Sequence, residues 1–202
     1  MIRRARVSEA HRVAAVVAAA FATDPIMTYL IPVSSSDTRR DRLVHFFRHL
    51  VAVELAKPDH LVDVVEVDGK IVAVAVWSQL DTPQKPTPKE MLRLLPVAVR
   101  VFRGGIARSL KLASAMERTH PATPHRYLAF IGVHPDAQGN GWGGRLVASV
   151  TESLDEQGLG AYLESSNPLN VPLYSRHGFV ARDRVPLPDD APVMTPMWRD
   201  PR

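Results

Sequence analysis

The sequence lacks several features that define large classes of protein. Its 202 residues include no cysteine, which excludes a disulfide scaffold, a thiolate zinc site and a cysteine nucleophile. The apolar run from Val13 to Phe21 is too short to span a membrane. A signal peptide, with its longer apolar core and its cleavage site, is not evident either. We therefore expect a cytoplasmic protein without a membrane partner.

Basic residues form no dense run. The formal net charge is +4, and the Lys and Arg residues are scattered along the chain with few aromatic residues among them. A surface that binds nucleic acid usually gathers such residues on one face. Hydrophobic residues make up 46% of the chain and charged residues 23%, as in ordinary globular proteins. We expect no nucleic-acid partner, and a single domain over residues 1–202 that is a monomer or a homodimer.

The order of sequence patterns predicts an α/β fold. Two β-branched runs, residues 61–67 and 70–77, flank Asp68-Gly69 and predict a hairpin with a type I′ turn. Strands and helices alternate in the C-terminal half, which indicates helices layered on a sheet. Further strands are expected at residues 3–7, 126–133, 161–164, 179–184 and 193–198. Helices are expected at residues 9–22 with Ser8 as cap, at 36–56 with Ser36 or Asp37 as cap, at 89–117 with a break at Gly104-Gly105, at 142–157 and at 168–177. Proline-bearing linkers are expected at residues 81–88 and 120–124.

A glycine-rich loop lies between the strand that ends at Val133 and the helix that starts near Trp142. Backbone N–H groups of such a loop, with the N-terminus of the next helix, bind phosphate groups. Gly139-x-Gly141-x-x-Gly144 satisfies the dinucleotide-binding fingerprint, and Glu164 lies 20 residues further on, where a ribose-binding acid is expected. Five residues separate Val133 from Gly139, however, and too few residues follow the loop for a doubly wound sheet. A P-loop is excluded because no Gly-Lys-Ser or Gly-Lys-Thr ends the loop.

The same loop also reads Gln138-x-x-Gly141-x-Gly143. Together with the strand that begins at Tyr127, it resembles the acetyl-CoA-binding motif of the GNAT (GCN5-related) N-acetyltransferases. The segment from Tyr162 to Phe179 is similar to the second core motif of that family, an Asn followed seven residues later by Tyr and then by Gly-Phe. The resemblance implies the GNAT fold, a mixed central sheet flanked by helices and splayed at the strand before the loop. It also implies acetyl-CoA as co-substrate.

Three shorter segments resemble one branch of the family. Ala20–Pro25, Val74–Trp77 and Tyr162–Ser166 are similar to segments of the puromycin N-acetyltransferases. The core that binds acetyl-CoA is expected over about residues 126–184, with a helical insertion over about residues 88–118. These helices are expected either to cover the acceptor site or to form a dimer contact.

The resemblance also implies the parts of a cofactor site. In the family, N–H groups of the loop hold the CoA pyrophosphate, and the N–H of Val133 is placed to polarise the acetyl carbonyl. The cofactor-binding residues expected on this basis are Ile131, Val133, Gln138, Gly139, Asn140, Gly141, Gly143, Gly144, Arg145, Asn167 and Asn170. Arg145 is equally compatible with a solvated side chain. No metal is expected, because His45 and His49, although four residues apart, have no third ligand nearby.

Amide formation from a thioester needs a neutral amine, a polarised carbonyl and a proton for the leaving thiolate. An alkylammonium, whose pKa is about 10, must first lose a proton. The resemblance places the family's catalytic tyrosine at Tyr174, which we expect to be the general acid; the structural alternative is a core aromatic packed beside Phe179. Glu164, at the end of an apolar strand, is the candidate general base, directly or through a water. Its alternative is a carboxylate paired with an arginine.

The residues that bind the acceptor are harder to infer. Asp24 and Tyr29 follow the first helix, where the family's substrate-binding loop lies, so they are candidates to attract a cationic amine and to stack on a ring. Asp24-Pro25 is also an ordinary helix stop. The sequence favours acetyl transfer to a primary amine of a small molecule, such as an antibiotic or an aminonucleoside. Acetylation of protein N-termini or lysines, an NAD-binding oxidoreductase and a non-catalytic CoA-binding module stay open.

Overall fold

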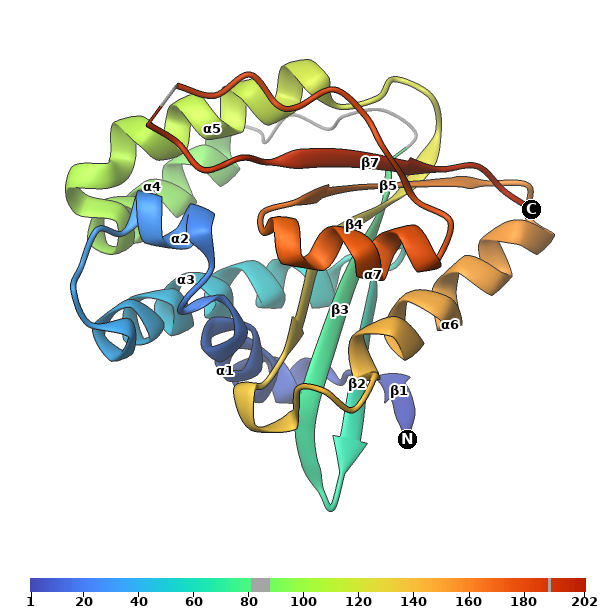
Figure 1. The fold of residues 1–202 in the computed structure, drawn as a ribbon. Helices are drawn as coiled ribbons and strands as arrows, with labels where there is room; N and C mark the ends of the chain where they lie inside the picture. The colour runs from blue at the N-terminus through green and yellow to red at the C-terminus, as the bar shows by residue number, and fades with distance from the viewer. Residues whose placement is uncertain (81–87, 189) are drawn as a thin grey trace.

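The computed structural model describes residues 1–80, 88–188 and 190–202. Within these residues, seven strands form one sheet in the order β1-β2-β3-β4-β5-β7-β6 (Figure 1). The strands are β1 (Ile2–Arg4), β2 (Leu61–Val67), β3 (Lys70–Leu80), β4 (His125–Val133), β5 (Gly160–Ser165), β6 (Val180–Ala181) and β7 (Thr195–Arg199). Every predicted strand is present, but β6 is far shorter than residues 179–184, and β1 ends at Arg4 instead of reaching Val7.

The sheet is mixed and splits open along one strand. β4 and β5 are parallel, and the other neighbouring strands are antiparallel. β4 and β5 pair only where His125–Tyr127 faces Gly160–Tyr162. Beyond Tyr127, β4 stays paired with β3 as far as Val133, and no strand among the described residues pairs with its other edge. This confirms the expected mixed sheet, splayed at the strand before the glycine loop.

Helices cover both faces of the sheet (Figure 1). They are α1 (Ala10–Phe21), α2 (Pro25–Leu30), α3 (Ser36–Ala56), α4 (Pro88–Phe102), α5 (Ile106–Thr119), α6 (Trp142–Glu156) and α7 (Val171–Arg176). Alternate side chains of β3 enter two cores, as the period of a strand requires. Val74 and Val76 pack with α1 and α3, whereas Ala75 and Trp77 pack with α6. None of the helices in the described parts of the chain is long and apolar enough to cross a bilayer.

Local sequence signals placed most turns correctly and some caps wrongly. Asp68 (φ 49°) and Gly69 (φ 72°) both have positive φ, which confirms the type I′ hairpin turn. Ser8 is not the cap of α1, because a 3-10 turn, η1 (Val7–Glu9), precedes the helix and Glu9 is its N-cap. Ser35 caps α3 in place of Ser36 or Asp37, since its Oγ accepts from the N–H of Thr38 (3.3 Å).

The stop after α1 is also the start of a helix that the sequence analysis did not predict. Asp24 is the N-cap of α2, where its Oδ1 accepts from the N–H of Met27 (3.1 Å). Pro25 occupies the first position of the helix, where a proline is favoured because its missing N–H costs nothing there. Asp24 also lies close to the end of β5, because its Oδ2 accepts from the hydroxyl of Ser166.

The predicted break at Gly104-Gly105 is confirmed. A 3-10 turn, η2 (Arg103–Gly105), separates α4 from α5. Gly105 packs directly on α2, and a Cβ added there would lie 1.9 Å from the carbonyl oxygen of Leu30. Only glycine permits this approach, which fixes α5 against α2. The linker predicted at residues 81–88 lies outside the described residues except for Pro88, the first residue of α4.

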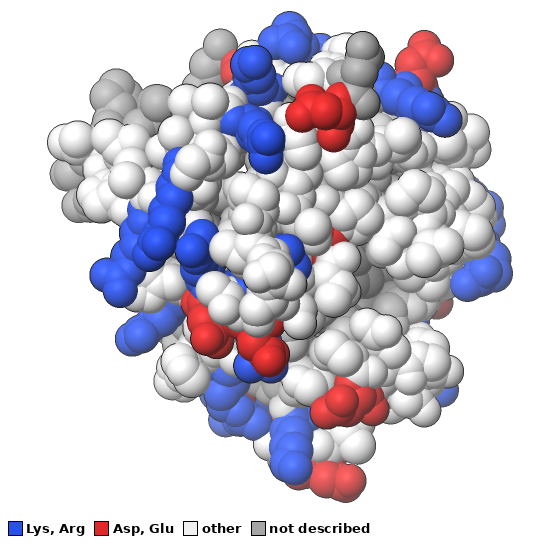
Figure 2. Space-filling model, turned by 60° about the vertical axis from the view of Figure 1, so that its left-hand side comes forward, with Lys and Arg blue, Asp and Glu red and all other residues white. Residues whose placement is uncertain are grey.

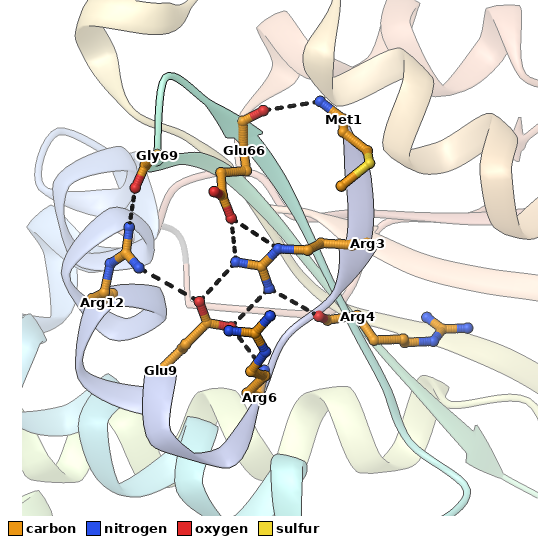
Figure 3. A network of polar contacts seen from close by, with 8 residues as sticks. All are labelled: Met1, Arg3, Arg4, Arg6, Glu9, Arg12, Glu66 and Gly69. Carbon is orange, nitrogen blue, oxygen red and sulfur yellow. Dashed lines mark hydrogen bonds and ion pairs between the residues drawn. The ribbon is translucent and has the colours of Figure 1, made fainter.

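A network of ion pairs fastens β1 to the rest of the chain (Figure 3). The guanidinium of Arg3 donates to both carboxylate oxygens of Glu9 (2.7 Å each) and also to Glu66. Glu9 accepts in addition from the N–H of Arg6 (2.9 Å). The hydrogen bond from Arg3, followed by that from Arg6, lowers the pKa of Glu9 to about 2. Arg12 extends the network by donating to the carbonyl of the hairpin turn (2.6 Å).

Candidate active site

A cavity of about 940 Å³ lies where β4 diverges from β5. The glycine loop and the start of α6 form one end of it, and α2, α5 and the end of β5 form the other. The expected site residues that line it are Asp24, Ile131, Val133, Gln138, Gly139, Gly141, Gly143, Gly144, Glu164, Asn167, Asn170 and Tyr174. The lining does not include Asn140, Arg145 or Tyr29. One cavity thus joins the expected cofactor site to the expected catalytic residues.

The backbone N–H groups of Ile131 and Val133 point away from β3, towards the gap. The N–H of His134 donates to the carbonyl of Val72 (2.8 Å), and the next pair in the register is Val133 with Ala73. Hydrogen-bonded and non-hydrogen-bonded pairs alternate along an antiparallel ladder. Ile131 and Val133 therefore occupy the non-hydrogen-bonded positions, so a bound molecule can pair with them as an added strand would.

The loop is shaped to present its backbone. Gly139 (φ 79°) and Gly141 (φ 74°) are in the left-handed region, which other residues adopt only at a cost. The amide of Asn140 donates to the carbonyls of Ala137 (3.1 Å) and Gln138 (3.2 Å), so this side chain braces the loop and does not face the cavity. Gly141 is the N-cap of α6, and no side chain caps that helix. The first N–H groups of α6 are thus available to an anion.

The remaining cofactor candidates differ in what they offer. The amide nitrogen of Gln138 donates to the carbonyl of Val133 (3.3 Å). Asn167 uses Oδ1 to cap a 3-10 turn, η4 (Pro168–Asn170), by accepting from Leu169 (3.0 Å), which leaves its NH₂ group as the available donor. Arg145 is exposed, and its guanidinium stacks 4.8 Å from the ring centre of Trp142. This arrangement favours the solvated interpretation of Arg145.

Tyr174 belongs to the core and also lines the cavity. The residue is 5% exposed, and its ring centre lies 6.3 Å from that of Phe179. Within the described residues, its hydroxyl makes no hydrogen bond. Burial, and then the charge of Asp24, raises the pKa of Tyr174. The phenol is therefore protonated near neutral pH, as a general acid must be.

Glu164, at the end of β5, is held by a tyrosine, and no arginine among the described residues pairs with it. Its side chain is 1% exposed, and Oε2 accepts from the hydroxyl of Tyr127 (2.8 Å). Oε1 is buried and has no hydrogen-bond partner among the described residues. Burial, and then the charge of Glu164, raises the pKa of Tyr127 well above its ordinary value. Tyr127 therefore stays a donor that fixes the carboxylate and leaves Oε1 as the oxygen that can take up a proton.

Asp24 bridges two elements at the end of the cavity opposite the glycine loop, where the acceptor is expected. It is 8% exposed, and its Oδ2 accepts from the hydroxyl of Ser166 (2.6 Å), in the loop after β5. Burial raises the pKa of Asp24, although the hydrogen bonds from Ser166 and Met27 oppose the shift. Asp24 thus serves as a helix cap and also lines the cavity. Tyr29 lies outside the lining, with the guanidinium of Arg108 stacked 4.7 Å from its ring centre.

The end of the cavity where the acceptor is expected is largely apolar. Side chains that line this end come from α2, α3, α4, α5 and the approach to β7: Ile26, Met27, Leu30, Phe46, Phe102, Leu110, Leu112, Met116 and Met194. The acidic residues of the lining are Asp24 and Glu164. α5 therefore forms part of the wall of this end of the cavity. On the face shown in Figure 2, acidic and basic side chains are interspersed and form no continuous basic surface.

Sequence reasoning missed three polar residues of this site. Tyr127 begins the segment that resembles the acetyl-CoA-binding motif, but its apolar neighbours give no sign of its hydrogen bond to Glu164. Ser166 ends the segment Tyr162–Ser166, and no role was expected for it. His120 was assigned to a linker, but its Nδ1 lies 3.8 Å from Oε1 of Glu164. Pairing of β4 with β5 brings these distant residues together. Among the described residues, no group of three or more His, Asp or Glu is arranged to hold a metal ion.

Comparison with known proteins identifies the class that this fold and cavity define. The family model described as "Acetyltransferase (GNAT) family" matches residues 27–179. The match covers more than half of the chain, and the chain belongs to this family. A solved acetyltransferase from Corynebacterium glutamicum, related to a histone acetyltransferase, is 26% identical with a TM-score of 0.72, and the alignment covers 100% of this chain and 96% of that one.

Other similar proteins share the fold or one segment. The polyamine N-acetyltransferase of Drosophila melanogaster is 16% identical with a TM-score of 0.64, and 99% of each chain is covered. An uncharacterised N-acetyltransferase of Schizosaccharomyces pombe is 38% identical over 64 residues, 32% of this chain and 26% of that protein. The mycothiol acetyltransferase of Paenarthrobacter aurescens is 40% identical over 67 residues, 32% of this chain and 20% of that protein. The chain thus spans about a fifth to a quarter of these two relatives.

Proposed function

We propose that this protein transfers the acetyl group of acetyl-CoA to a primary amine of a small molecule, by direct attack while both substrates are bound. The single observation that carries the proposal is the continuous cavity from the glycine loop to Tyr174 and Glu164. A cofactor whose pyrophosphate lies on the loop and whose arm lies along β4 brings its thioester to these residues. Family membership gives the reaction class.

The cofactor is held mainly by backbone groups in this proposal. The pyrophosphate binds the N–H groups of Gly139–Gly144 at the start of α6. The pantetheine amides pair with Ile131 and Val133, and Asn167 donates its NH₂ group to the arm. The N–H of Val133 then bonds to the acetyl oxygen as negative charge develops there, which stabilises the tetrahedral intermediate.

Two side chains move the protons. The side chain of Glu164 is almost closed to solvent. It therefore takes the proton of the ammonium through one bridging water and not by direct contact. The neutral amine attacks the acetyl carbon, the C–N bond forms and the C–S bond breaks. The thiolate of CoA receives the proton of Tyr174, and the second proton that the nitrogen loses as it becomes an amide returns to the Tyr174 phenolate. Asp24 supplies negative charge at the acceptor end, which attracts a cationic amine.

The apolar acceptor end favours a small molecule with a hydrophobic body over a polyamine or a protein chain. Relatives do not choose between these classes: similar solved structures include an agmatine N-acetyltransferase and an N-acetyltransferase of a ribosomal-protein alanine. A polyamine requires several acidic groups along its length, but the lining offers Asp24 and Glu164. Apolar lining from α5 and α2 instead suits one amine on an apolar or aromatic body. Aminonucleosides such as puromycin fit this description.

An NAD-binding oxidoreductase does not fit the structure. A doubly wound dinucleotide fold needs a largely parallel sheet, but only β4 and β5 are parallel among the pairs of the described sheet. Glu164, the expected ribose acid, is buried against Tyr127. The glycines that match the fingerprint are therefore needed for the conformation of this loop and do not indicate a bound dinucleotide.

Release of CoA from acetyl-CoA, read with a thiol reagent, tests the proposal. The chain has no cysteine, so the protein adds no thiol signal. The panel comprises puromycin, a hydrophobic aryl-alkylamine, agmatine, spermidine, a peptide with a free N-terminus and a lysine peptide. Turnover with the hydrophobic monoamines is expected. Turnover confined to peptides or polyamines contradicts the small-molecule proposal, and no turnover with any amine supports a non-catalytic CoA-binding module.

A further inference from the structure

His120, the residue after the C-terminal end of α5, lies against the carboxylate proposed as general base. Its Nδ1 is 3.8 Å from Oε1 of Glu164, which is longer than a hydrogen bond. The side chain of His120 is 10% exposed and that of Glu164 only 1%. His120 is therefore the member of the pair that can exchange a proton with solvent.

The position of the hydrogen on each of two neighbouring imidazoles follows from their partners. Nδ1 of His125 lies 2.6 Å from the carbonyl oxygen of Thr123. A carbonyl only accepts, so Nδ1 of His125 carries a hydrogen. Burial lowers the pKa of His125, so this ring is neutral and its Nε2 has a lone pair. Nε2 of His120 lies 3.1 Å from Nε2 of His125 and therefore donates a hydrogen bond to its lone pair.

Neutral His120 is thereby fixed as the tautomer with hydrogen on Nε2. Its Nδ1 then carries a lone pair and lies 3.8 Å from Oε1 of Glu164, which has no hydrogen-bond partner among the described residues. Oε2 already accepts from Tyr127. Two proton acceptors thus face each other, and the 3.8 Å between them is the distance expected when no proton joins them.

We propose that Glu164 and His120 together accept the proton of the substrate ammonium, with His120 as the positioning residue that receives the proton from Oε1. The inference rests on the proposed function, because it assigns a partner to the proposed base. The N–H bond of the ammonium breaks, and its electron pair stays on nitrogen for the attack. The proton reaches Oε1 and passes to Nδ1, which gives an imidazolium beside a restored carboxylate. His120 then returns this proton to solvent, and the reaction releases one proton overall.

Charged and titratable groups surround the pair on several elements. Tyr127 and His125 on β4 and Tyr162 on β5 lie closest, with Glu54 on α3 and Arg182 after β6 further away. The imidazolium formed in the reaction lies beside the Glu164 carboxylate, which stabilises it. The phenols of Tyr127 and Tyr162 stay neutral because burial raises the pKa of each.

The test replaces His120 by asparagine, whose amide can donate to Oε1 but cannot take up a proton. With the best amine of the panel, the H120N variant is expected to lose about ten- to a hundredfold in kcat near pH 7. The KM for acetyl-CoA should change less than about twofold, since His120 does not line the cofactor end. The deficit should shrink as pH rises towards 9, because more of the amine then arrives already neutral.

Two matched variants separate this inference from the proposed function. His49 on α3 is exposed, and H49N should match the wild type at every pH. E164Q should be impaired at least as much as H120N. An impaired E164Q with a fully active H120N, or with an H120N deficit equal at all pH values, overturns the role of His120 and leaves the base in place. A fully active E164Q instead overturns Glu164 as the base of the proposed function.

Imidazole nitrogen spectra of the wild-type protein test the hydrogen positions without any variant. With ¹⁵N-labelled histidine at alkaline pH, His125 is expected as the Nδ1–H tautomer and His120 as the Nε2–H tautomer. The opposite tautomer of His120 would place a hydrogen on Nδ1, where it donates to Glu164, and would overturn the inference.

Discussion

Replacing Tyr174 by phenylalanine separates the two roles that its position combines. The ring packs beside Phe179 and stays in the variant. The hydroxyl makes no hydrogen bond within the described residues, so its loss leaves no partner unsatisfied. The free energy of unfolding should therefore change by less than about 1 kcal/mol. A protein that is equally stable and far less active is the expected outcome.

The loss of activity follows from the proton that the thiolate needs. General acid catalysis contributes about 10²- to 10⁴-fold, so kcat should fall by that factor, equivalent to about 3–5 kcal/mol in the barrier. The KM for acetyl-CoA should stay within about threefold, because the hydroxyl acts in the transition state.

The assay is the release of CoA with the best acceptor amine, accompanied by thermal unfolding. Tyr29→Phe serves as the control, since Tyr29 lies outside the cavity lining and keeps its ring. The control should turn over at the wild-type rate. If Tyr174→Phe retains turnover within about twofold of the wild type, Tyr174 is only a core aromatic and the general-acid assignment is wrong.

Two further predictions concern stability. Gly105→Ala should lower the free energy of unfolding by about 1–3 kcal/mol in denaturant titrations, because its Cβ would overlap a backbone carbonyl of α2; Gly104→Ala, whose Cβ meets nothing within 4 Å, is the control, and an equal loss in both variants would contradict the packing of α5 on α2. The pKa of Glu9 is about 2 in the folded protein against an ordinary 4.5, so the stabilisation that its ion pair with Arg3 gives is fully present above pH 4.5 and is lost as pH falls towards 2. Glu9→Gln should be less stable than the wild type at pH 6 and should lose less stability between pH 4.5 and 2.5; identical pH dependence of the two proteins would show that the network does not act through Glu9.

Features decided by a few neighbouring residues were predictable from the sequence. An Asp-Gly pair between two β-branched runs strongly favours a type I′ turn, and Asp68-Gly69 forms one. The break at Gly104-Gly105 and the helix after the glycine loop likewise depend on local chemistry. Capping was less predictable. Glu9, which accepts hydrogen bonds from Arg3 and Arg6, is the N-cap of α1 in place of Ser8.

Site residues that belong to a sequence motif were predictable. Site residues that only the pairing of strands brings together were not. Nine of the eleven expected cofactor residues line the cavity, and seven of the nine belong to the continuous segment that runs from β4 through the loop into α6. Tyr29 does not line the cavity, and the guanidinium of Arg108 stacks on its ring. His120 has no local signal at all. Its position next to Glu164 depends on α5 ending where β4 and β5 begin their short parallel pairing.

Calorimetric titration with acetyl-CoA tests the central claim most directly, namely that the loop and the gap between β4 and β5 hold this cofactor. The wild type should bind one equivalent with a saturable heat. Gly141→Ala, which forces alanine to φ 74° in open space, should weaken binding by about tenfold, from a strain of about 1–2 kcal/mol. Gly69→Ala imposes the same strain at φ 72° in the distant hairpin turn and should leave the affinity unchanged. No binding by the wild type, or equal binding by all three proteins, would contradict the account.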